Sequence, residues 1–308
     1  IQIALTDLMA SMGMRPAAVM GMSMGEIAAA YAAGGISDRD AILVACQRAR
    51  LMGEGEEMIG GTDQEGAMAV VELGTEALAE FVAAHPEATG VEPAVYSGPG
   101  MTTVGGPGKA VDAAEEIDRV VPTIEKVHQR HPDVLISVDT WRSEVAEAAI
   151  AAGAGLINDT WAGWDPELIE VAGHHRVGYV CSHTGGITPR TRPHRVHFDD
   201  VVADVIAETT QLAERAAALG CPEDLTFIDP THDFGKNTFH GIEILRRVDE
   251  LVATGWPVLM ALSNKDFVGE TVGRAVDERV AGTLAATAWA AARGVAAFRV
   301  HEVRETID

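Results

Sequence analysis

The residues of this chain best suited to chemistry are polar side chains that each follow a short apolar run. They are Asp139, Asn158 with Asp159, His183, Asp229, the triplet Ser263-Asn264-Lys265, and Arg299 with His301. Carboxylates and an amide can accept hydrogen bonds from the N–H groups of a polar heterocycle, and cations can bind an anion such as phosphate. A single polar residue after a strand is ordinarily a helix cap or turn former. Six such positions in succession predict one substrate site.

The apolar runs before these residues predict a parallel β-sheet. The runs are VLISVD, GLIND, VGYVCSH, LTFID, PVLMALS and VAAFRVH, and amphipathic segments such as Ser143–Ala152 and Phe198–Leu219 lie between most of them. Continuous apolar strands that alternate with helices indicate a sheet buried on both faces. Six such steps fit an α/β protein with a (β/α)₈ barrel better than an open sheet, with two barrel strands unaccounted for. In a barrel the carboxyl ends of the strands converge on one mouth, where substrates bind.

A second candidate centre lies near the amino terminus, in AAVMGMSMGEIAAAYAAGG. The G-x-S-x-G pattern around Ser23 has the form of a nucleophile elbow, a tight turn that exposes the serine hydroxyl. A serine is a poor nucleophile at neutral pH unless a base takes its proton. His85 is expected at the surface of a helix end, and His128 and His131 belong to the helix and loop before the first predicted barrel strand. The sequence provides the serine without a histidine placed to activate it.

The composition excludes several function classes. The net charge of −23 argues against binding nucleic acid through phosphate contacts. No apolar run approaches the roughly 18 to 20 residues of a membrane helix, and no export signal precedes the first helix. The odd number of cysteines, 3 without CxxC spacing, suggests reduced thiols. We therefore expect a cytoplasmic protein with no membrane and no nucleic-acid partner, and we expect both chain ends to be cut from a longer reading frame.

Methionine and histidine divide the chain sharply. Ten of the eleven methionines lie at or before Met101, and ten of the eleven histidines lie at or after His128. Both changes fall near GPGMTTVGGPGKAVDAAEEI, which indicates that two families of sequence meet there. We expect one domain over residues 1–107 and a second over residues 108–308.

Four motifs carry a resemblance in the second part. LISVDTWRSEVAEAAIAAGAGLIND, IDPTHDFGKN, LMALSNK and FRVHEV resemble the dihydropteroate synthases of folate biosynthesis, in family order from about Gly108 to the end. The resemblance implies a (β/α)₈ barrel and a transferase that joins 6-hydroxymethyl-dihydropterin pyrophosphate to p-aminobenzoate. Pyrophosphate would be released with the help of Mg²⁺. Synthases of this family are commonly dimers, so the resemblance also implies a homodimer.

The resemblance implies roles for individual positions. The residues that would bind substrate are Asp139, Asn158, Asp229, Phe234 and Lys265. The first three would hydrogen-bond the pterin edge, and Lys265 would lie against the ring and reach its carbonyl. Arg299 and His301 would bind the leaving pyrophosphate. Departure of pyrophosphate leaves positive charge on the pterin methylene, so catalysis would rest on positioning and on stabilisation of the leaving group.

Three departures from the family pattern lower the expected activity. The usual SRK triplet is Ser263-Asn264-Lys265, which loses the arginine that normally packs near the aminobenzoate. The usual DPGxGF reads DPTHDF over residues 229–234, and both changes resemble a divergent actinobacterial branch of the family. The first two strands of the family are absent, together with the asparagine that helps to hold magnesium. The predicted barrel therefore has an open edge.

Residues 1–107 carry a second resemblance. IQIALTDLMASMGMRPAAVMGMSMGEIAAAYAAGGISDRDAILVACQRARLM resembles the acyltransferase domains of polyketide and fatty-acid synthases. AVYSGPGMTTVGGP, expected to be a β-hairpin, continues the match into their small ferredoxin-like subdomain. The resemblance implies that Ser23 takes an acyl group from acyl-CoA and that Arg48 pairs with the carboxylate of a malonyl-type extender. The catalytic histidine of that family would fall after residue 107, where the second family of sequence begins, so this site is expected to be incomplete.

Three functions therefore stay open at the level of sequence. The first is a dihydropteroate synthase-like transferase impaired by its missing strands, and the second is a catalytically inactive pterin-binding protein. The third is an acyltransferase that acts through Ser23. A chimera of two incomplete domains, produced by recombination, assembly or deliberate construction, explains the junction better than a natural fusion of whole domains.

Overall fold

The computed structural model of the chain describes residues 2–14, 16–19, 24–59, 66–98, 100–189 and 196–307. The chain forms two compact units, one of Ile1–Met68 with Gly105–Lys109 and one of Ala69–Val104 with Ala110–Asp308. The expected family boundary between residues 107 and 108 falls where strand β3 (Met101–Pro107) ends and helix α5 (Gly108–Arg130) begins. As a boundary between two domains it stays a prediction.

The first unit contains the helices α1 (Gln2–Ser11), α2 (Met24–Ala32) and α3 (Asp38–Ile59). Ser37 caps α3, because its hydroxyl oxygen accepts the Asp40 amide N–H at 3.1 Å. Among the described residues of Ile1–Met68, Ala41 is the one buried hydrophobic residue. Large apolar side chains are exposed on α1 and α3, among them Leu5, Leu8, Met9, Ile42, Leu43, Val44, Leu51 and Met52. This part of the chain therefore buries little apolar surface of its own.

A small three-stranded sheet follows, in the order β1-β3-β2. Its elements along the chain are β1 (Gly66–Val71), α4 (Thr75–Ala84), β2 (Glu92–Gly98), β3 and α5. The expected hairpin is confirmed to the extent that β2 and β3 are hydrogen-bonded neighbours. The β-α-β-β-α order matches the first five elements of a ferredoxin-like subdomain.

The six predicted barrel strands are present. They are β4 (Ser137–Asp139), β5 (Leu156–Asp159), β6 (Gly178–Ser182), β7 (Thr226–Asp229), β8 (Leu259–Met260) and β9 (Ala297–Phe298). β4, β5, β6 and β7 pair in parallel in chain order, and β8 pairs in parallel with β9. A parallel bridge between Ile228 and Val258 links the two groups. This is a (β/α)₈ barrel without its first two strands, and β4 and β9 each have one described strand neighbour.

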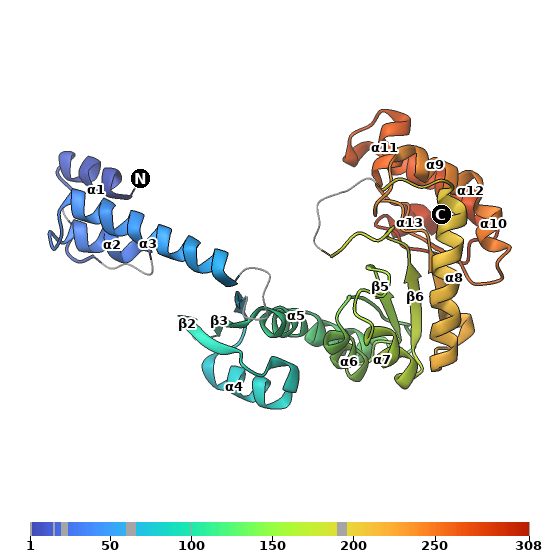
Figure 1. Ribbon diagram of the computed structural model, residues 1–308, viewed down its shortest axis with the longest axis horizontal. Helices are drawn as coiled ribbons and strands as arrows, with labels where there is room; N and C mark the ends of the chain where they lie inside the picture. Colours follow the sequence, from blue (N-terminus) through green and yellow to red (C-terminus); the bar gives the residue numbers. More distant parts are fainter. Residues whose placement is uncertain are drawn as a thin grey trace. The chain divides into compact units, whose positions relative to one another are not determined.

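Helices follow the strands as a barrel requires. They are α6 (Ser143–Ala151), α7 (Leu168–His175), α8 (Val201–Leu219), α9 (Thr238–Arg246), α10 (Val248–Val252), α11 (Asp266–Val272), α12 (Val280–Ala291) and α13 (Val303–Ile307). Figure 1 shows α8 lying beside β6. α8 begins at Val201 rather than at the predicted Phe198, because the Asp200 carboxylate caps it by accepting the amide N–H groups of Val202 and Ala203, each at 3.0 Å. None of the helices in the described part of the chain is long and apolar enough to cross a membrane.

Helix α5 packs against both α4 and the barrel. Its Ile117 lies in one apolar cluster with Val145 of α6 and with Phe81 of α4. Farther along the same helix, Ile124 packs against Val138 of β4. A single helix thus contacts the small subdomain and the first described strand of the barrel.

A buried ion pair fixes the same helix near the carboxyl end of β4. The Arg142 side chain, in the turn between β4 and α6, is bound to the Glu116 carboxylate and lies 3.1 Å from the Asp112 carboxylate. Arg142 and Glu116 are both buried. Charged groups out of water are stable only when they are paired, so this contact specifies where α5 lies on the barrel.

Candidate functional site

The carboxyl ends of the six strands form the candidate site, which we call the mouth. Asp139 and Asn158 are register partners at the ends of β4 and β5. The Asn158 side-chain amide donates to the Asp139 carboxylate at 3.4 Å, and the Thr160 hydroxyl donates to the same carboxylate at 3.2 Å. The Asn158 Oδ1 atom is buried without a described partner. A buried acceptor of this kind is available to a ligand N–H group.

A side chain that follows the last strand lies close to one that ends the first. The Arg299 guanidinium, directly after β9, lies 3.9 Å from the Asp139 carboxylate. Partial desolvation raises the pKa of the Asp139 carboxyl although its side chain is 45% exposed, while Arg299, Thr160 and Lys265 act in the opposite direction. The structure therefore brings together residues that lie 160 positions apart in the sequence, since 299 − 139 = 160.

Asp229 lies at the end of β7 and is 5% exposed. Its carboxylate accepts the Thr231 amide N–H at 2.7 Å. Burial raises the pKa of this carboxyl to about 6, although Thr231, Lys236, Lys265 and Arg299 act in the opposite direction. A carboxylate this deeply placed is costly unless a hydrogen-bond donor covers it. That makes Asp229 suited to a ligand that supplies N–H groups.

The loop after β7 is held rigidly by Lys236. The buried Lys236 ammonium donates to the carbonyl oxygens of His183 at 2.9 Å, Phe234 at 3.1 Å and Thr231 at 3.3 Å. Thr231 has a φ of 50°, in the left-handed region that favours the glycine usual at this place. The loop thus keeps a fixed path although its glycine has been replaced.

The same loop places a carboxylate on Lys265. The Lys265 ammonium, in the segment after β8, lies 3.0 Å from the Asp233 carboxylate, and its side chain is 19% exposed. The adjacent carboxylate, Asp266, lies 2.9 Å from the Arg279 guanidinium.

Ser263 links the segments after β8 and β9. Its hydroxyl donates to the Glu302 carboxylate at 2.8 Å, and the His301 Nδ1 atom lies 2.8 Å from the same hydroxyl oxygen. Because the single hydroxyl proton is directed to Glu302, His301 Nδ1–H is the donor to Ser263. Asn264 replaces the family's arginine, and its side-chain amide donates to Glu302 at 2.8 Å. His301 can then offer its Nε2 atom to a ligand.

Aromatic side chains border the loop after β7. Phe234 meets Trp161, in the loop after β5, edge to face with ring centroids 5.0 Å apart. His232 is buried and stacks on Phe267, with both ring nitrogens lacking a described partner. Burial lowers the pKa of His232 to about 3, so this ring is neutral and acts as core.

Two strand-end residues of the predicted set bind neighbouring parts of the scaffold. The Asp159 carboxylate accepts the Tyr179 hydroxyl at 2.7 Å and the Gly163 amide at 2.6 Å, so it shapes the loop after β5. His183 is fully buried, and its Nε2 atom lies 2.9 Å from Asp204 and 3.4 Å from Glu208, both on α8. The structure gives both residues scaffold contacts, and their predicted part in the substrate site stays a prediction. Both polar groups bind the scaffold because they are buried and must be hydrogen-bonded.

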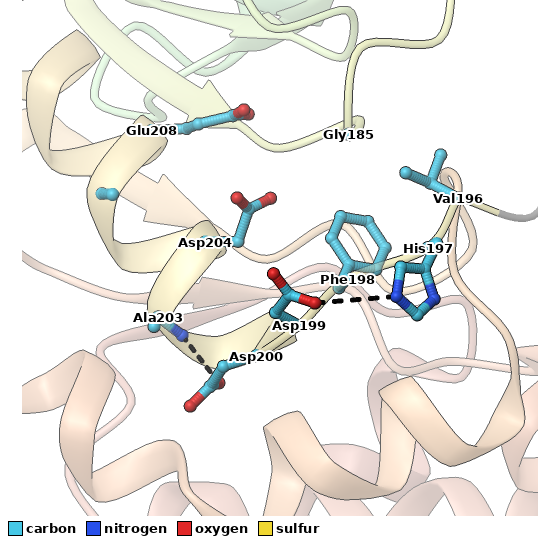
Figure 2. A pocket seen from close by; sticks show the side chains of 10 residues that line it. Gly185, Val196, His197, Phe198, Asp199, Asp200, Ala203, Asp204 and Glu208 are labelled. Atoms are coloured by element: carbon cyan, nitrogen blue, oxygen red, sulfur yellow. Dashed lines mark hydrogen bonds and ion pairs between the residues drawn. The ribbon is translucent and has the colours of Figure 1, made fainter.

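A cavity of about 600 Å³ lies at the amino-terminal end of α8. Figure 2 shows carboxylates gathered around it, namely Asp199, Asp200, Asp204 and Glu208. A cavity lined by these acidic groups repels phosphate. The cavity is therefore not the expected pyrophosphate site, which requires the cations of the mouth.

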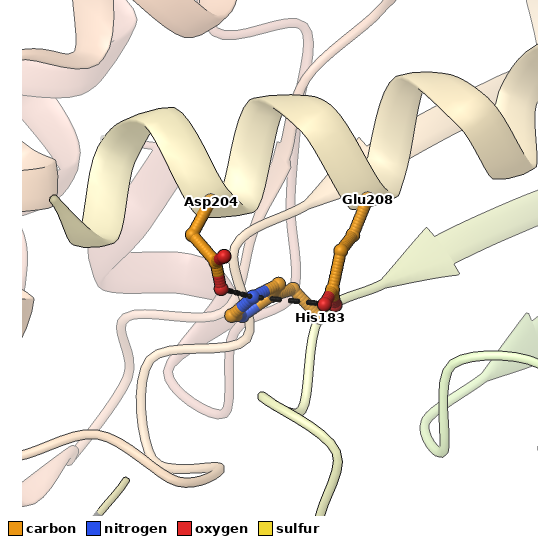
Figure 3. A group of neighbouring side chains, drawn as sticks. All are labelled: His183, Asp204 and Glu208. Atoms are coloured by element: carbon orange, nitrogen blue, oxygen red, sulfur yellow. Dashed lines mark hydrogen bonds and ion pairs between the residues drawn. The ribbon is translucent and has the colours of Figure 1, made fainter. Parts of the chain in front are cut away.

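The family implies Mg²⁺, and the described residues do not fit it. One group of three potential metal ligands is present in the described ranges, His183, Asp204 and Glu208, whose ligand atoms lie within 4.8 Å of one another (Figure 3). Mg²⁺ prefers oxygen ligands, whereas this group includes an imidazole. At the mouth, the Asp139 and Asp233 carboxylates face Arg299 and Lys265. No step proposed for this protein uses a metal ion.

The amino-terminal candidate site is only partly described. Ser23 lies outside the described residues, and Arg48 lies on α3. His85 Nδ1 lies 2.9 Å from the Phe81 carbonyl oxygen. His128 packs on Gly153, where an added Cβ would come within 2.6 Å of the imidazole. Both rings have structural surroundings, and the roles of Ser23 and Arg48 stay predictions.

The fold and the mouth together define a class of protein. It is a barrel that can hold a polar heterocycle against the buried Asp229 carboxylate and an anion against Arg299 at the carboxyl ends of its strands. The chain belongs to the family of pterin binding enzymes, whose model matches residues 100–301. A model of an acyl transferase domain matches residues 1–138. Residues 100–138, which include α5, match both.

Individual relatives place the chain beside the dihydropteroate synthases. It is 59% identical over 221 residues to a Mycobacterium leprae protein named "Inactive dihydropteroate synthase 2", which covers 69% of this chain and 76% of the relative. A solved Mycobacterium tuberculosis structure is 54% identical, with a TM-score of 0.53 over 64% of this chain and 74% of that one. The Xanthomonas albilineans dihydropteroate synthase in complex with 7,8-dihydropteroate is 39% identical, with a TM-score of 0.58 over 65% and 73%. The predicted fold and the dihydropteroate synthase-like character are confirmed.

Sequence reasoning missed three residues of the mouth. Asp233 stands inside the altered DPTHDF motif, and Glu302 follows His301, but neither has a pattern that names its partner. Trp161 comes two positions after Asp159 and could have been found by the same strand-end argument.

Proposed function

We propose that the mouth binds a 7,8-dihydropterin carrying a 6-hydroxymethyl pyrophosphate, and that synthase turnover is impaired. The observation that carries this proposal is Asp229, a buried carboxylate with Asp139 and the unpartnered Asn158 oxygen also at the mouth. A pterin edge presents N–H groups to acceptors of this kind. The names of the relatives support the same ligand class.

The remaining mouth residues divide between ring and anion. Lys265 would reach the pterin carbonyl oxygen, and Phe234 with Trp161 would border the ring. Arg299 would bind the pyrophosphate, and His301 would donate to it through Nε2–H in the imidazolium form, in which both ring nitrogens are donors. Arg299 is 56% exposed, so its guanidinium has room to turn from Asp139 toward a phosphate.

We expect impaired turnover because the two cations of the mouth are already paired with carboxylates. Both Arg299 and Lys265 are directed at carboxylates, and Asn264 supplies no charge where the family has arginine. Leaving-group stabilisation by a positioned cation is commonly worth several kcal/mol of barrier, on the order of 3 kcal/mol for one group. p-Aminobenzoate binding is therefore expected to be weak, and dihydropteroate formation slow or absent.

Asp229→Asn tests the assignment of the pterin edge. The amide has no charge and presents an NH2 donor where one carboxylate oxygen stood, so affinity for 6-hydroxymethyl-dihydropterin should fall by roughly 10- to 100-fold, the worth of a charged hydrogen bond. Asp224→Asn, an exposed carboxylate before the same strand, is the matched control and should leave affinity unchanged. Equal affinity in the wild type and Asp229→Asn would overturn the proposal.

A further inference from the structure

We propose that Asp233 is an internal counter-ion that holds Lys265 and must be displaced when the ligand binds. The inference rests on the proposed function, because the ligand that competes for Lys265 is the pterin. Asp233 would then set both the affinity and the ligand preference of the mouth.

The geometry indicates that Lys265 and Asp233 form a specific ion pair rather than a chance contact at the surface. The Lys265–Asp233 distance is 3.0 Å, and the lysine side chain is 19% exposed. Asp233 belongs to the loop fixed by the three carbonyl contacts of Lys236. A carboxylate on a rigid loop loses little conformational entropy when it pairs, which strengthens the interaction.

The other carboxylates around Lys265 are engaged elsewhere. Asp266, the next residue, pairs with Arg279 at 2.9 Å. Asp229 accepts the Thr231 amide, and Asp139 faces Arg299. Of the described carboxylates, Asp233 is the one with an ion-pair contact to Lys265.

The consequence for ligands is a competition. A pterin carbonyl oxygen that reaches Lys265 must replace a full negative charge with a neutral acceptor. A ligand with an anionic group near Lys265 also meets the Asp233 charge. The mouth should therefore favour ligands that present N–H donors toward Asp233 and Lys265. Ligands that present an acceptor or an anion there should bind more weakly.

Asp233→Asn tests the competition directly. Its affinity for 6-hydroxymethyl-dihydropterin pyrophosphate, measured by titration calorimetry, should exceed that of the wild type by about fivefold. Asp266→Asn makes the same charge change one residue from Lys265 and should leave affinity unchanged. In a Lys265→Met background, Asp233→Asn should raise affinity less than it does in the wild type, because no ion pair is left to displace. Weaker binding by Asp233→Asn would overturn the proposal, because Asp233 would then be a ligand acceptor.

A second readout needs no ligand. Mass spectrometry can follow the rate at which an amine-reactive ester labels Lys265 in the full chain. Loss of the partner should raise that rate several-fold in Asp233→Asn and leave it unchanged in Asp266→Asn. An unchanged rate overturns the inference even if the pterin binds. A raised rate without pterin binding by any variant supports the ion pair and overturns the proposed function.

Discussion

Arg299, directly after the last of the six described barrel strands, lies 3.9 Å from Asp139, which ends the first of them. This contact joins the two ends of the described strand order, between which two further strands would stand in a complete barrel. It also pairs the Arg299 guanidinium, the cation proposed to bind the pyrophosphate, with a carboxylate.

Arg299→Ala should separate the two parts of the ligand. Affinity for 6-hydroxymethyl-dihydropterin pyrophosphate should fall by about tenfold or more, the worth of a charge-assisted contact. Affinity for the same pterin without phosphate should change little, because its edge is held elsewhere. Isothermal titration of both ligands checks this, with Arg293→Ala, a cation that stacks on Trp289, as the control. An equal loss for both ligands would contradict the assignment.

Pterin binding should weaken in acid because of Asp229. The pterin N–H groups require the ionised carboxylate, and the pKa of this carboxyl is about 6 in the free protein. Protonation therefore competes with the ligand below pH 6, and affinity at pH 5 should be about tenfold lower than the plateau above pH 7. Fluorescence titrations between pH 4.5 and 8 measure this, and a flat profile would count against Asp229 as the acceptor.

The same carboxyl should cost folding stability at neutral pH. Its pKa is raised from the usual 3.8 to about 6 in the folded chain, so its contribution to stability falls as the pH rises through that window. Asp229→Asn should consequently raise the free energy of unfolding at pH 7, by up to about 3 kcal/mol, and the gain should vanish near pH 4. Urea unfolding at the two pH values checks the sign.

Arg142→Met should destabilise the barrel strongly. It removes the partner of the buried Glu116 carboxylate, and breaking a buried pair costs about 3 to 5 kcal/mol. The double variant Arg142→Met with Glu116→Leu should recover much of that loss, since no charge stays buried. Urea unfolding followed by tryptophan fluorescence measures both, and a loss within about 0.5 kcal/mol would show that the pair is dispensable.

Limited proteolysis should divide the chain unevenly. Ile1–Met68 holds one described buried hydrophobic residue, whereas the second unit holds the apolar cluster around Ile157, Tyr179 and Ile228. Segments with little burial open at low free-energy cost and are cut first. Cleavage sites mapped by mass spectrometry should lie before residue 69 at early times, and early cuts within α6 to α8 would contradict this.

The sequence predicted the barrel strands well because a buried strand is a short apolar run. The regular alternation of such runs with amphipathic segments indicates parallel pairing in chain order. VLISVD, GLIND and LTFID each end at an acidic or amide residue, and each is a parallel strand in the structure. The contacts of the strand-end side chains could not be predicted from the sequence as well as the strands themselves. Asp159 and His183 follow strands like the others, yet they bind Tyr179 and helix α8, since the packing behind the sheet decides which way a strand-end residue points.

Contacts between distant loops could not be predicted from spacing. Asp233 and Lys265 are 32 positions apart, since 265 − 233 = 32, and their pairing depends on the path that Lys236 imposes on the loop after β7. The double contact of helix α5 could not be predicted from the sequence either. Its amphipathic pattern indicates a buried face, but only packing shows that α5 contacts both α4 and β4.

The central claim is tested most directly by one titration of the full chain with 6-hydroxymethyl-7,8-dihydropterin pyrophosphate, followed by a product assay with p-aminobenzoate. We predict saturable binding at one site for each chain, weakened roughly 10- to 100-fold in Asp229→Asn, with little or no dihydropteroate formed. The absence of binding at high protein concentration would contradict the assignment of the mouth. Product formation at the rate of an active synthase would contradict the claim that the paired cations impair turnover.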